Sequence, residues 1–321
     1  MENMHSVVYT GNDRNVGEEL ARLADLVGID FAHVRAPAIL MFDDADVPGH
    51  VQAHFHEMFA PYFPRGRVQL DPRESADVLE LMAAVGLTMR GRVLGVVGAH
   101  GGAGTSTIAA WLARLIAVDE DCALVDANPA SAGIDHLLAI DAEPGKRWAD
   151  LAGDGAILAG RLNRVLPRWQ EVHVVSADDR GGVPDAAAAA RVISALAQTH
   201  AWTVLDLPVT AGIAGTPWHG LLDWCDAVVM VTRPDAVALA HARARRDQIG
   251  GKLVTVGSMV GTKMEAAHLA GVIGVPTLFG VRNMRGTRAD LDHGVTPGDR
   301  KRSGADKDLR ALWEHLKEVT A

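Results

Sequence analysis

The sequence predicts an α/β protein in which a doubly wound, mostly parallel sheet follows a smaller α/β domain. Two observations support this fold class. From about Arg92 onward, short and continuously apolar runs alternate with stretches of helical periodicity, the pattern of strands buried on both faces of a parallel sheet. The residues before Arg92 repeat the alternation on a smaller scale, and 321 residues suffice for about two domains. We therefore expect domains over residues 1–88 and 89–321.

The apolar runs of the larger domain define its expected strands, which are Val93–Val97, Ala123–Val125, Val172–Val175, Thr203–Leu207, Ala227–Val231, Leu253–Val256 and Thr277–Phe279. Its expected helices include Ser106–Val118, Ala186–Gln198, Ala236–Gln248 and Asp308–Val319. The smaller domain is expected to have strands at Ser6–Tyr9, Asp30–Val34, Ala38–Phe42 and Val68–Leu70, with helices at Glu18–Val27 and Ser75–Val85. A ligand of a doubly wound sheet should bind at the carboxyl ends of its parallel strands.

Composition narrows the range of functions. A net charge of −9 argues against bulk electrostatic binding to nucleic acid or to anionic lipid. Cys122 and Cys225 each begin an apolar run and lack metal-ligand spacing, so we expect reduced core residues. No apolar run approaches the roughly 20 residues that span a bilayer, and the N-terminus lacks a signal-peptide layout. We therefore expect a soluble, cytoplasmic protein.

The stretch GVVGAHGGAGTST, residues 95–107, places a glycine-rich turn between an expected strand and an expected helix. In the Walker A pattern G-x-x-x-x-G-K-[ST], glycines let backbone N–H groups approach phosphate, the lysine neutralises charge and the hydroxyl binds magnesium. Gly98 and Gly104 have the required separation and Ser106 supplies the hydroxyl, but Thr105 stands where the lysine belongs. The stretch is either a phosphate site that has lost its lysine or a tight turn without a ligand.

Acidic residues stand at the ends of two further expected strands. Asp126 follows the run Ala123–Val125, and Asp206 lies in the segment TVLDL. P-loop ATPases place carboxylates at such strand ends to hold magnesium and to position the attacking water. The alternative for each aspartate is a cap on the helix that follows. Three such segments in this order favour a nucleotide site.

These segments resemble the MinD/ParA superfamily, whose deviant Walker A motif is K-G-G-x-G-K-[ST]-T. The stretch HGGAGTST has His100 in place of the signature lysine and Thr105 in place of the P-loop lysine. VDANP resembles the D-x-D-P switch, with Asn128 in place of its second aspartate, and LDLPVTAG resembles the D-x-P-x-G switch. VVMVTRPDAVAL, residues 228–239, resembles the strand and turn that follow.

The resemblance assigns roles to particular residues. Those implied to bind nucleotide are Gly101, Gly102, Gly104, Thr105, Ser106 and Thr107, those implied to hold Mg²⁺ are Ser106, Asp126 and Asp206, and the candidate catalytic residues are Asp126 and Asn128. Because a charge-assisted contact is worth about 1.5–3 kcal/mol, loss of the lysine should weaken ATP or ADP binding roughly tenfold to a hundredfold. Asn128 removes an anionic acceptor near the expected water.

Within the superfamily, the chain is most similar to the CpaE-like or septum site-determining (Ssd) group, whose members lack the Walker lysines and carry a receiver-like N-terminal domain. This resemblance implies a spatial regulator or scaffold for septum-site selection, or for tad-type pilus or secretion machinery, with little or no ATP hydrolysis. The alternative is an active MinD/ParA-type ATPase with an altered P-loop, which would take its cationic group from elsewhere, for example Arg233 or a partner's arginine.

The same resemblance sets expectations for partners and location. We expect protein partners from the division or secretion machinery, and a homo-oligomer that forms without ATP. We expect no bulk nucleic-acid binding and only indirect or peripheral contact with a membrane. The chain should be cytoplasmic, with recruitment to the septum, the pole or the inner membrane surface.

Three other groups of residues have alternative interpretations. Asp43 and Asp44 follow an expected strand at the place of a receiver phosphoacceptor, but the full acidic pair and the lysine of a receiver are missing, which favours a degenerate receiver. His50 and His54 have the spacing of zinc ligands on one helical face, with His56 and Glu57 close by, although packed or solvated histidines are favoured. The apolar stripe of the last helix favours docking on the domain over a lipid anchor.

Overall fold

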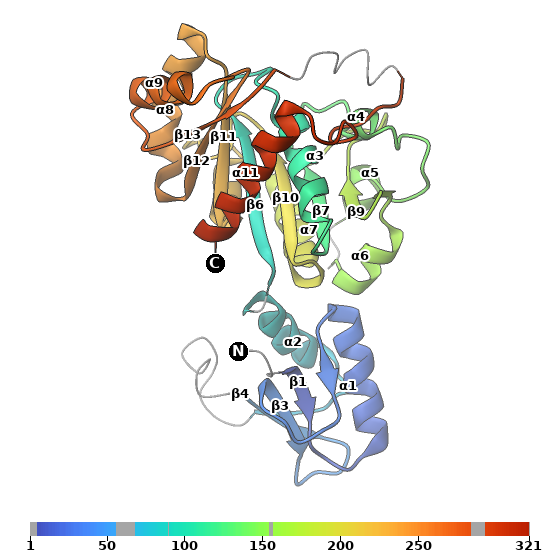
Figure 1. Ribbon diagram of the computed structural model, residues 1–321. Helices are drawn as coiled ribbons and strands as arrows, with labels where there is room; N and C mark the ends of the chain where they lie inside the picture. The colour runs from blue at the N-terminus through green and yellow to red at the C-terminus, as the bar shows by residue number, and fades with distance from the viewer. Residues whose placement is uncertain (1–4, 56–67, 89, 154–156, 284–292, 321) are drawn as a thin grey trace. The chain divides into compact units, whose positions relative to one another are not determined.

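The computed structural model describes residues 5–55, 68–88, 90–153, 157–283 and 293–320. The chain divides into two compact units. One comprises the residues up to Gly91 together with 156–164 and 194–199, and the other comprises the remaining residues. Each unit has its own sheet covered by helices (Figure 1), so the predicted α/β class is confirmed.

The smaller unit contains a five-stranded sheet of order β2-β1-β3-β4-β5. Its elements are β1 His5–Tyr9, α1 Arg14–Val27, β2 Phe31–Ala32, β3 Ala38–Asp44, β4 Val51–Phe55, β5 Val68–Leu70 and α2 Ala76–Thr88. Strand β1 runs parallel to β2 and β3, whereas β4 is antiparallel to both of its neighbours. Side chains from both helices and from β3 form its core, including Leu20, Leu23, Phe42 and Met82.

Strand β4 corrects one interpretation of the sequence. Val51 and Ala53 are buried on alternate positions of β4, which is the pattern of a strand and not of a helix. His54 therefore lies on a strand, with its Nδ1 3.7 Å from an oxygen of Asp43, and the helical spacing proposed for zinc does not occur. His56 and Glu57 lie outside the described residues. Within the described parts of the chain, no three His, Cys, Asp or Glu side chains are grouped as a metal site.

The larger unit contains an eight-stranded sheet of order β13-β12-β11-β6-β10-β7-β9-β8. Its strands are β6 Arg92–Gly98, β7 Cys122–Asp126, β8 Arg168–Trp169, β9 Val172–Val175, β10 Trp202–Leu207, β11 Ala227–Thr232, β12 Leu253–Ser258 and β13 Leu278–Val281. All seven predicted strands are present and mutually parallel. The two-residue β8, which the sequence did not indicate, is antiparallel to β9.

Helices complete the larger unit. They are α3 Thr105–Ile116, α4 Asp135–Leu138, α5 Trp148–Leu151, α7 Ala186–Thr199, α8 Ala236–Ile249, α9 Lys263–Ile273 and α11 Gly304–Val319, with 3₁₀ turns at His219–Trp224 and Gly250–Lys252. Helix α6, Ala159–Val165, and the last residues of α7, 194–199, are assigned to the smaller unit, except for Val165. Helices α3 and α11 pack against one face of the sheet (Figure 1). The α11 stripe of Leu309, Leu312 and Leu316 is buried there, and Trp313 meets Trp202 edge to face at 5.0 Å, which confirms the docked helix.

Two remaining expectations concern the cysteines and the membrane. Cys122 and Cys225 are both buried and neither forms a disulfide, as predicted for reduced core residues. Among the described residues, we find no helix that combines the length and the apolar character needed to cross a bilayer.

We expect Leu124→Ala to lower the free energy of unfolding of the larger unit by about 2–5 kcal/mol, because Leu124 is fully buried at the centre of β7 and its truncation leaves a cavity. All seven tryptophans of the chain follow Arg92, so tryptophan fluorescence during urea denaturation reports on this unit. Val118→Ala, at a position that is 67% exposed, is the control and should change stability by less than about 0.5 kcal/mol. A Leu124→Ala effect as small as that of the control would contradict the assigned core.

Candidate functional site

The glycine turn between β6 and α3 forms a loop whose backbone requires glycine at particular positions. Gly102 and Gly104 have φ values of 73° and 95°, in the left-handed region that disfavours other residues. A Cβ atom at either position would meet no atom within 4 Å, so the requirement comes from the backbone and not from crowding. Gly98 differs, because a Cβ there would lie 2.7 Å from the His100 carbonyl oxygen and 2.8 Å from Thr105 Oγ1. The loop therefore folds back closely over the end of β6.

Helix α3 begins directly after this loop and has no side-chain cap. Its N-cap residue is Gly104, which offers no side-chain acceptor to the first turn. The first backbone N–H groups of a helix have no partner within the helix, and the helix dipole adds partial positive charge at that end. Such an end binds anions, phosphate groups among them.

An open cavity of about 590 Å³ lies in front of the loop and the start of α3. It is lined by three segments, Gly98 with His100–Thr107, Asn128–Ala130, and Asp206–Thr210. The structure describes all of these lining residues, and they include no lysine or arginine. The cavity has the size of a small-molecule site, roughly 300–1,000 Å³, and it lies at the carboxyl ends of β6 and β10.

Asp206 carries the acidic group of this cavity. It lies on β10 and is only 3% exposed, and it is in register with Val96 of β6 and with Asp126 of β7. The pKa of Asp206 is raised to about 7, chiefly by burial and in smaller part by the nearby Asp126 carboxyl, while a hydrogen bond with the Ser106 hydroxyl opposes these effects. Two of the three residues expected to bind magnesium, Ser106 and Asp206, thus lie together in the lining of the cavity.

Asp126 lies next to Asp206 but does not line the cavity. It is 1% exposed, and its carboxyl oxygens accept hydrogen bonds from the backbone N–H groups of Asn128 at 3.3 Å and Ile134 at 3.2 Å. The Ser131 side chain and the Ala177 backbone add further hydrogen bonds, although burial is the largest influence and raises the pKa of Asp126. Its carboxyl group therefore holds the loop after β7 in place.

Asn128 and His100, which stand where the resembled superfamily has an aspartate and a lysine, also make local contacts. The side-chain oxygen of Asn128 accepts a hydrogen bond from the Ala130 N–H at 3.1 Å, so it stabilises its own turn. His100 Nδ1 lies 2.8 Å from the Gly101 carbonyl oxygen. Its Nε2 is buried and has no hydrogen-bond partner among the described residues.

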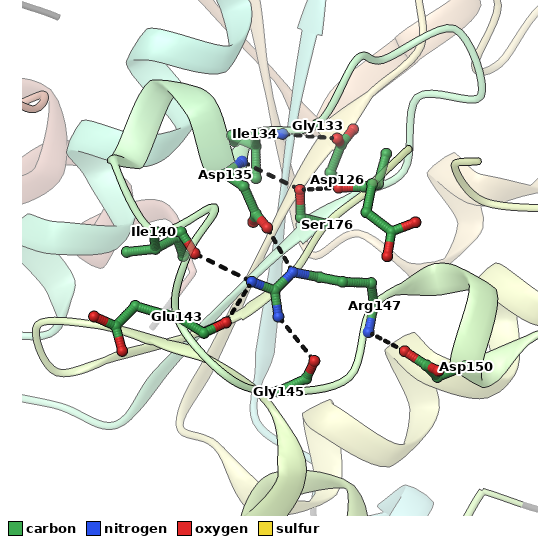
Figure 2. A network of polar contacts seen from close by, with 12 residues as sticks. Asp126, Gly133, Ile134, Asp135, Ile140, Glu143, Gly145, Arg147, Asp150 and Ser176 are labelled. Carbon is green, nitrogen blue, oxygen red and sulfur yellow. Dashed lines mark hydrogen bonds and ion pairs between the residues drawn. The ribbon is translucent and has the colours of Figure 1, made fainter. Parts of the chain in front are cut away.

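A buried arginine near the site was not anticipated from the sequence. Arg147 is 5% exposed, and its Nε donates to Asp135 Oδ2 at 2.5 Å. Its terminal nitrogens donate to the carbonyl oxygens of Gly145, Ile140 and Glu143 at 3.1–3.2 Å, as Figure 2 shows. No motif marks an Asp and an Arg twelve positions apart as a pair, since the loop between them decides whether they meet.

The hydrogen bonds around Arg147 are connected to the candidate site by the residues next to Asp135 and next to Arg147. Asp135 follows Ile134, whose N–H donates to Asp126, and the Asp135 N–H donates to Ser176 Oγ at 3.2 Å (Figure 2). Trp148, next to Arg147, donates its indole N–H to the Asp126 carbonyl oxygen at 2.6 Å. The loop after β7 is thus fixed at both ends against the residue that ends this strand.

The glycine loop, the free helix end and the strand-end carboxylates together define a doubly wound protein of the P-loop class. A family model described as "Cellulose biosynthesis protein BcsQ" matches residues 91–254, just over half of the chain. The chain belongs to this family.

Curated relatives and solved structures add to this assignment. The uncharacterised proteins MT3760 and Rv3660c, from two strains of Mycobacterium tuberculosis, are each 35% identical over 231 residues, 69% of this chain and 63% of theirs. The chain thus spans less than two thirds of their length. A ParA family ATPase from Chlorobium tepidum TLS has a TM-score of 0.54 at 18% identity, covering 71% of this chain and 99% of its own. MinD from Pyrococcus horikoshii OT3, complexed with Mg-ADP, has a TM-score of 0.54 at 17% identity, covering 72% and 97%. The chain has the MinD/ParA fold.

We expect Asp206→Asn to stabilise the larger unit at pH 8 but not at pH 5. A carboxyl whose folded pKa of about 7 exceeds its unfolded value of 3.8 adds stability at low pH, and this stability is lost as the pH rises through the folded pKa. In the native protein, the free energy of unfolding should therefore fall by on the order of 2–3 kcal/mol between pH 5 and pH 8.

Asparagine lacks this titration, so the variant should show a correspondingly smaller fall. Urea denaturation at pH 5 and at pH 8, followed by tryptophan fluorescence, gives this fall in the free energy of unfolding for the native protein and for the variant. Asp223→Asn, in the 3₁₀ turn and exposed to solvent, is the matched control. If the free energy of unfolding falls equally between pH 5 and pH 8 in the native protein and in Asp206→Asn, Asp206 is ionised at both pH values.

Proposed function

We propose that this chain is a MinD/ParA-like scaffold of the CpaE-like or Ssd kind that binds protein partners and hydrolyses little or no ATP. The observation that carries the proposal is the cavity at the carboxyl ends of β6 and β10, whose lining contains no lysine or arginine. A developing negative charge on a transferred phosphoryl group would find no side-chain cation there. The partners we propose belong to machinery for septum-site selection or for tad-type pilus assembly and secretion.

Weak nucleotide binding remains part of the proposal because half of a phosphate site is retained. The residues present fit such a ligand, since the free N–H groups at the start of α3 face the cavity and Ser106 meets Asp206 within it. Residues 101, 102 and 104–107 would hold the phosphates, and Ser106 with Asp206 would hold Mg²⁺. When bound, Mg²⁺ would neutralise phosphate charge. The Asp126 carboxyl accepts hydrogen bonds from backbone N–H groups of the loop after β7. It would therefore hold this loop in place and would not bind the metal ion.

The proposal also assigns a docking role to the N-terminal domain, which we place over residues 1–88, with the P-loop domain over 89–321. The order β2-β1-β3 and the position of Asp43 and Asp44 at the end of β3 support a receiver-like origin, whereas β4, which is antiparallel and follows β3 without a helix, departs from a parallel receiver sheet. These carboxyls are already engaged, Asp44 by the Tyr9 hydroxyl and the Asn12 N–H, and Asp43 by the Thr10 hydroxyl. We therefore propose a degenerate receiver that does not accept a phosphoryl group.

Location and assembly follow from the same proposal. The protein would be cytoplasmic, with recruitment to the septum, the pole or the inner membrane surface by its partners. His100 stands in place of the signature lysine and contacts its own loop. The side chain at this position would therefore contribute little to binding an ATP phosphate across a subunit interface. Any homo-oligomer should accordingly form without nucleotide.

We expect steady-state ATP hydrolysis by the full-length protein to equal that of the Ser106→Ala variant. Without a lysine the transition state lacks a stabilising charge, and removal of the hydroxyl should then have nothing further to abolish. Phosphate release is measured for both proteins with Mg-ATP. A native rate clearly above that of the variant would overturn the scaffold in favour of an active ATPase that takes its cation from elsewhere.

We expect Thr105→Lys to tighten Mg-ATP binding by roughly tenfold to a hundredfold, as a restored charge-assisted contact should. Isothermal titration calorimetry with ATP and ADP, with and without Mg²⁺, measures the dissociation constants. Thr105→Met supplies a long uncharged side chain as the matched control and should give no gain. Equal affinities for the lysine and methionine variants would mean that the loop no longer positions a lysine toward phosphate.

A further inference from the structure

Strand β13 forms one edge of the eight-stranded sheet, and the N–H of Arg282 directly after it donates to Asp308 Oδ2 at 3.0 Å. Its sequence, Leu278-Phe-Gly-Val281, has no charged residue, and it pairs with β12 on one side only among the described strands. The opposite edge is protected, because β8 has two residues, runs antiparallel and carries Arg168 in an ion pair with Glu171. Exposed edges present unpaired N–H and C=O groups, and proteins usually block them with charge or short strands.

A groove of about 670 Å³ runs beside β13, lined by residues of both α9 and α11. These two helices pack against β13, and the walls that they contribute consist largely of small side chains. Ala267 and Gly271 of α9 and Ala311 of α11 are exposed, so these walls leave room for side chains from another chain. Phe279 and Val260 add apolar surface. The groove therefore suits apolar side chains that accompany an added strand.

The charge at one end of the groove favours an acidic group. Lys263 lies at the first turn of α9, is exposed, and has no acidic partner among the described residues. The other charged lining residue, Asp308, is neutralised by Arg282, whose Nε and terminal nitrogen lie 2.9 Å and 2.7 Å from its oxygens. The positive end of the α9 dipole is already engaged, because Thr262 Oγ1 accepts from the Glu265 N–H and the Glu265 carboxylate accepts from the Gly261 N–H. Lys263 is therefore the group that would stabilise an anionic side chain at this end.

We propose that the β13 edge and its groove bind an extended segment of a partner protein as an additional strand. The backbone of this segment pairs with β13, alternate small apolar side chains occupy the groove, and an acidic residue lies at Lys263. The inference deepens the scaffold proposal and rests on it for the biological need of a partner. It does not involve the nucleotide cavity, so titrations with ATP and with peptide fail or succeed independently.

The test uses the full-length protein and fluorescein-labelled peptides of about eight residues, a common strand length. The peptides alternate valine and threonine and carry aspartate at one end or the other, because the segment can run in either direction. Matched peptides carry lysine in place of aspartate. Fluorescence anisotropy should show that one aspartate peptide binds at least about tenfold more tightly than its lysine counterpart, as charge complementarity requires.

Three variants separate pairing at this site from non-specific binding. Lys263→Glu should reverse the preference so that the lysine peptide binds more tightly. Ala267→Phe, at an exposed position, should fill the groove and abolish binding without disturbing the core. Met264→Ala is the control, since Met264 is 83% exposed on α9 and does not line the groove. Hydrogen exchange at Leu278–Val281 should slow when the peptide is bound.

Several results would overturn the proposal. One is the absence of binding of any peptide up to about 1 mM, which corresponds to only about 4 kcal/mol of affinity. Another is binding that Lys263→Glu and Ala267→Phe leave unchanged, or that leaves exchange at β13 unaltered. A homodimer in sedimentation that Ala267→Phe converts to monomer would assign the edge to a second copy of the chain instead.

Discussion

Asp126 and Asp206 are buried side by side on neighbouring strands, and the arrangement of the candidate site depends on how these two carboxyl groups are accommodated. Two negative charges cannot be buried together without compensation. The structure resolves this in two ways. Asp126 accepts hydrogen bonds from the loop after β7, whereas Asp206 has a raised pKa and a hydrogen bond with Ser106. The same pair therefore fixes that loop and the first turn of α3, which are two of the cavity's walls.

Arg147 extends this constraint outward. Burying a guanidinium is costly unless its donors are satisfied, and here one carboxylate and three carbonyl oxygens accept from it. Those carbonyls belong to a segment with little regular structure, so the arginine takes the place of the helix or sheet hydrogen bonds that such a segment lacks. Because the segment also ends at Trp148, which donates to the Asp126 backbone, contacts within the chain hold the loop in place.

The sequence predicted the fold better than the contacts of the site, for a physical reason. Strands such as β6 and β10 are buried on both faces, so continuous apolar runs mark them. Strand β4 was not predicted, because its alternation comprises only Val51 and Ala53 and the spacing of His50 and His54 also fits a helix. The tight turn at Gly102 and Gly104 was predictable because glycine readily adopts the left-handed backbone conformation found there. The partners of Asp126 were not, since Ala177 is distant in sequence and Ile134 is placed by a loop that no local pattern specifies.

The cavity therefore has a mixed electrostatic character that bears on what it can bind. Its attraction for phosphate comes from backbone N–H groups and the dipole of α3, which are fixed and do not titrate. Its acidic side chain has a pKa of about 7, so near neutral pH a proton often occupies the place where a magnesium ion would be held. A metal ion has to displace this proton, and no lysine compensates if it does not. The groove at the β13 edge shares no lining residue with this cavity, so the interaction proposed there does not depend on the proton or the metal ion at Asp206.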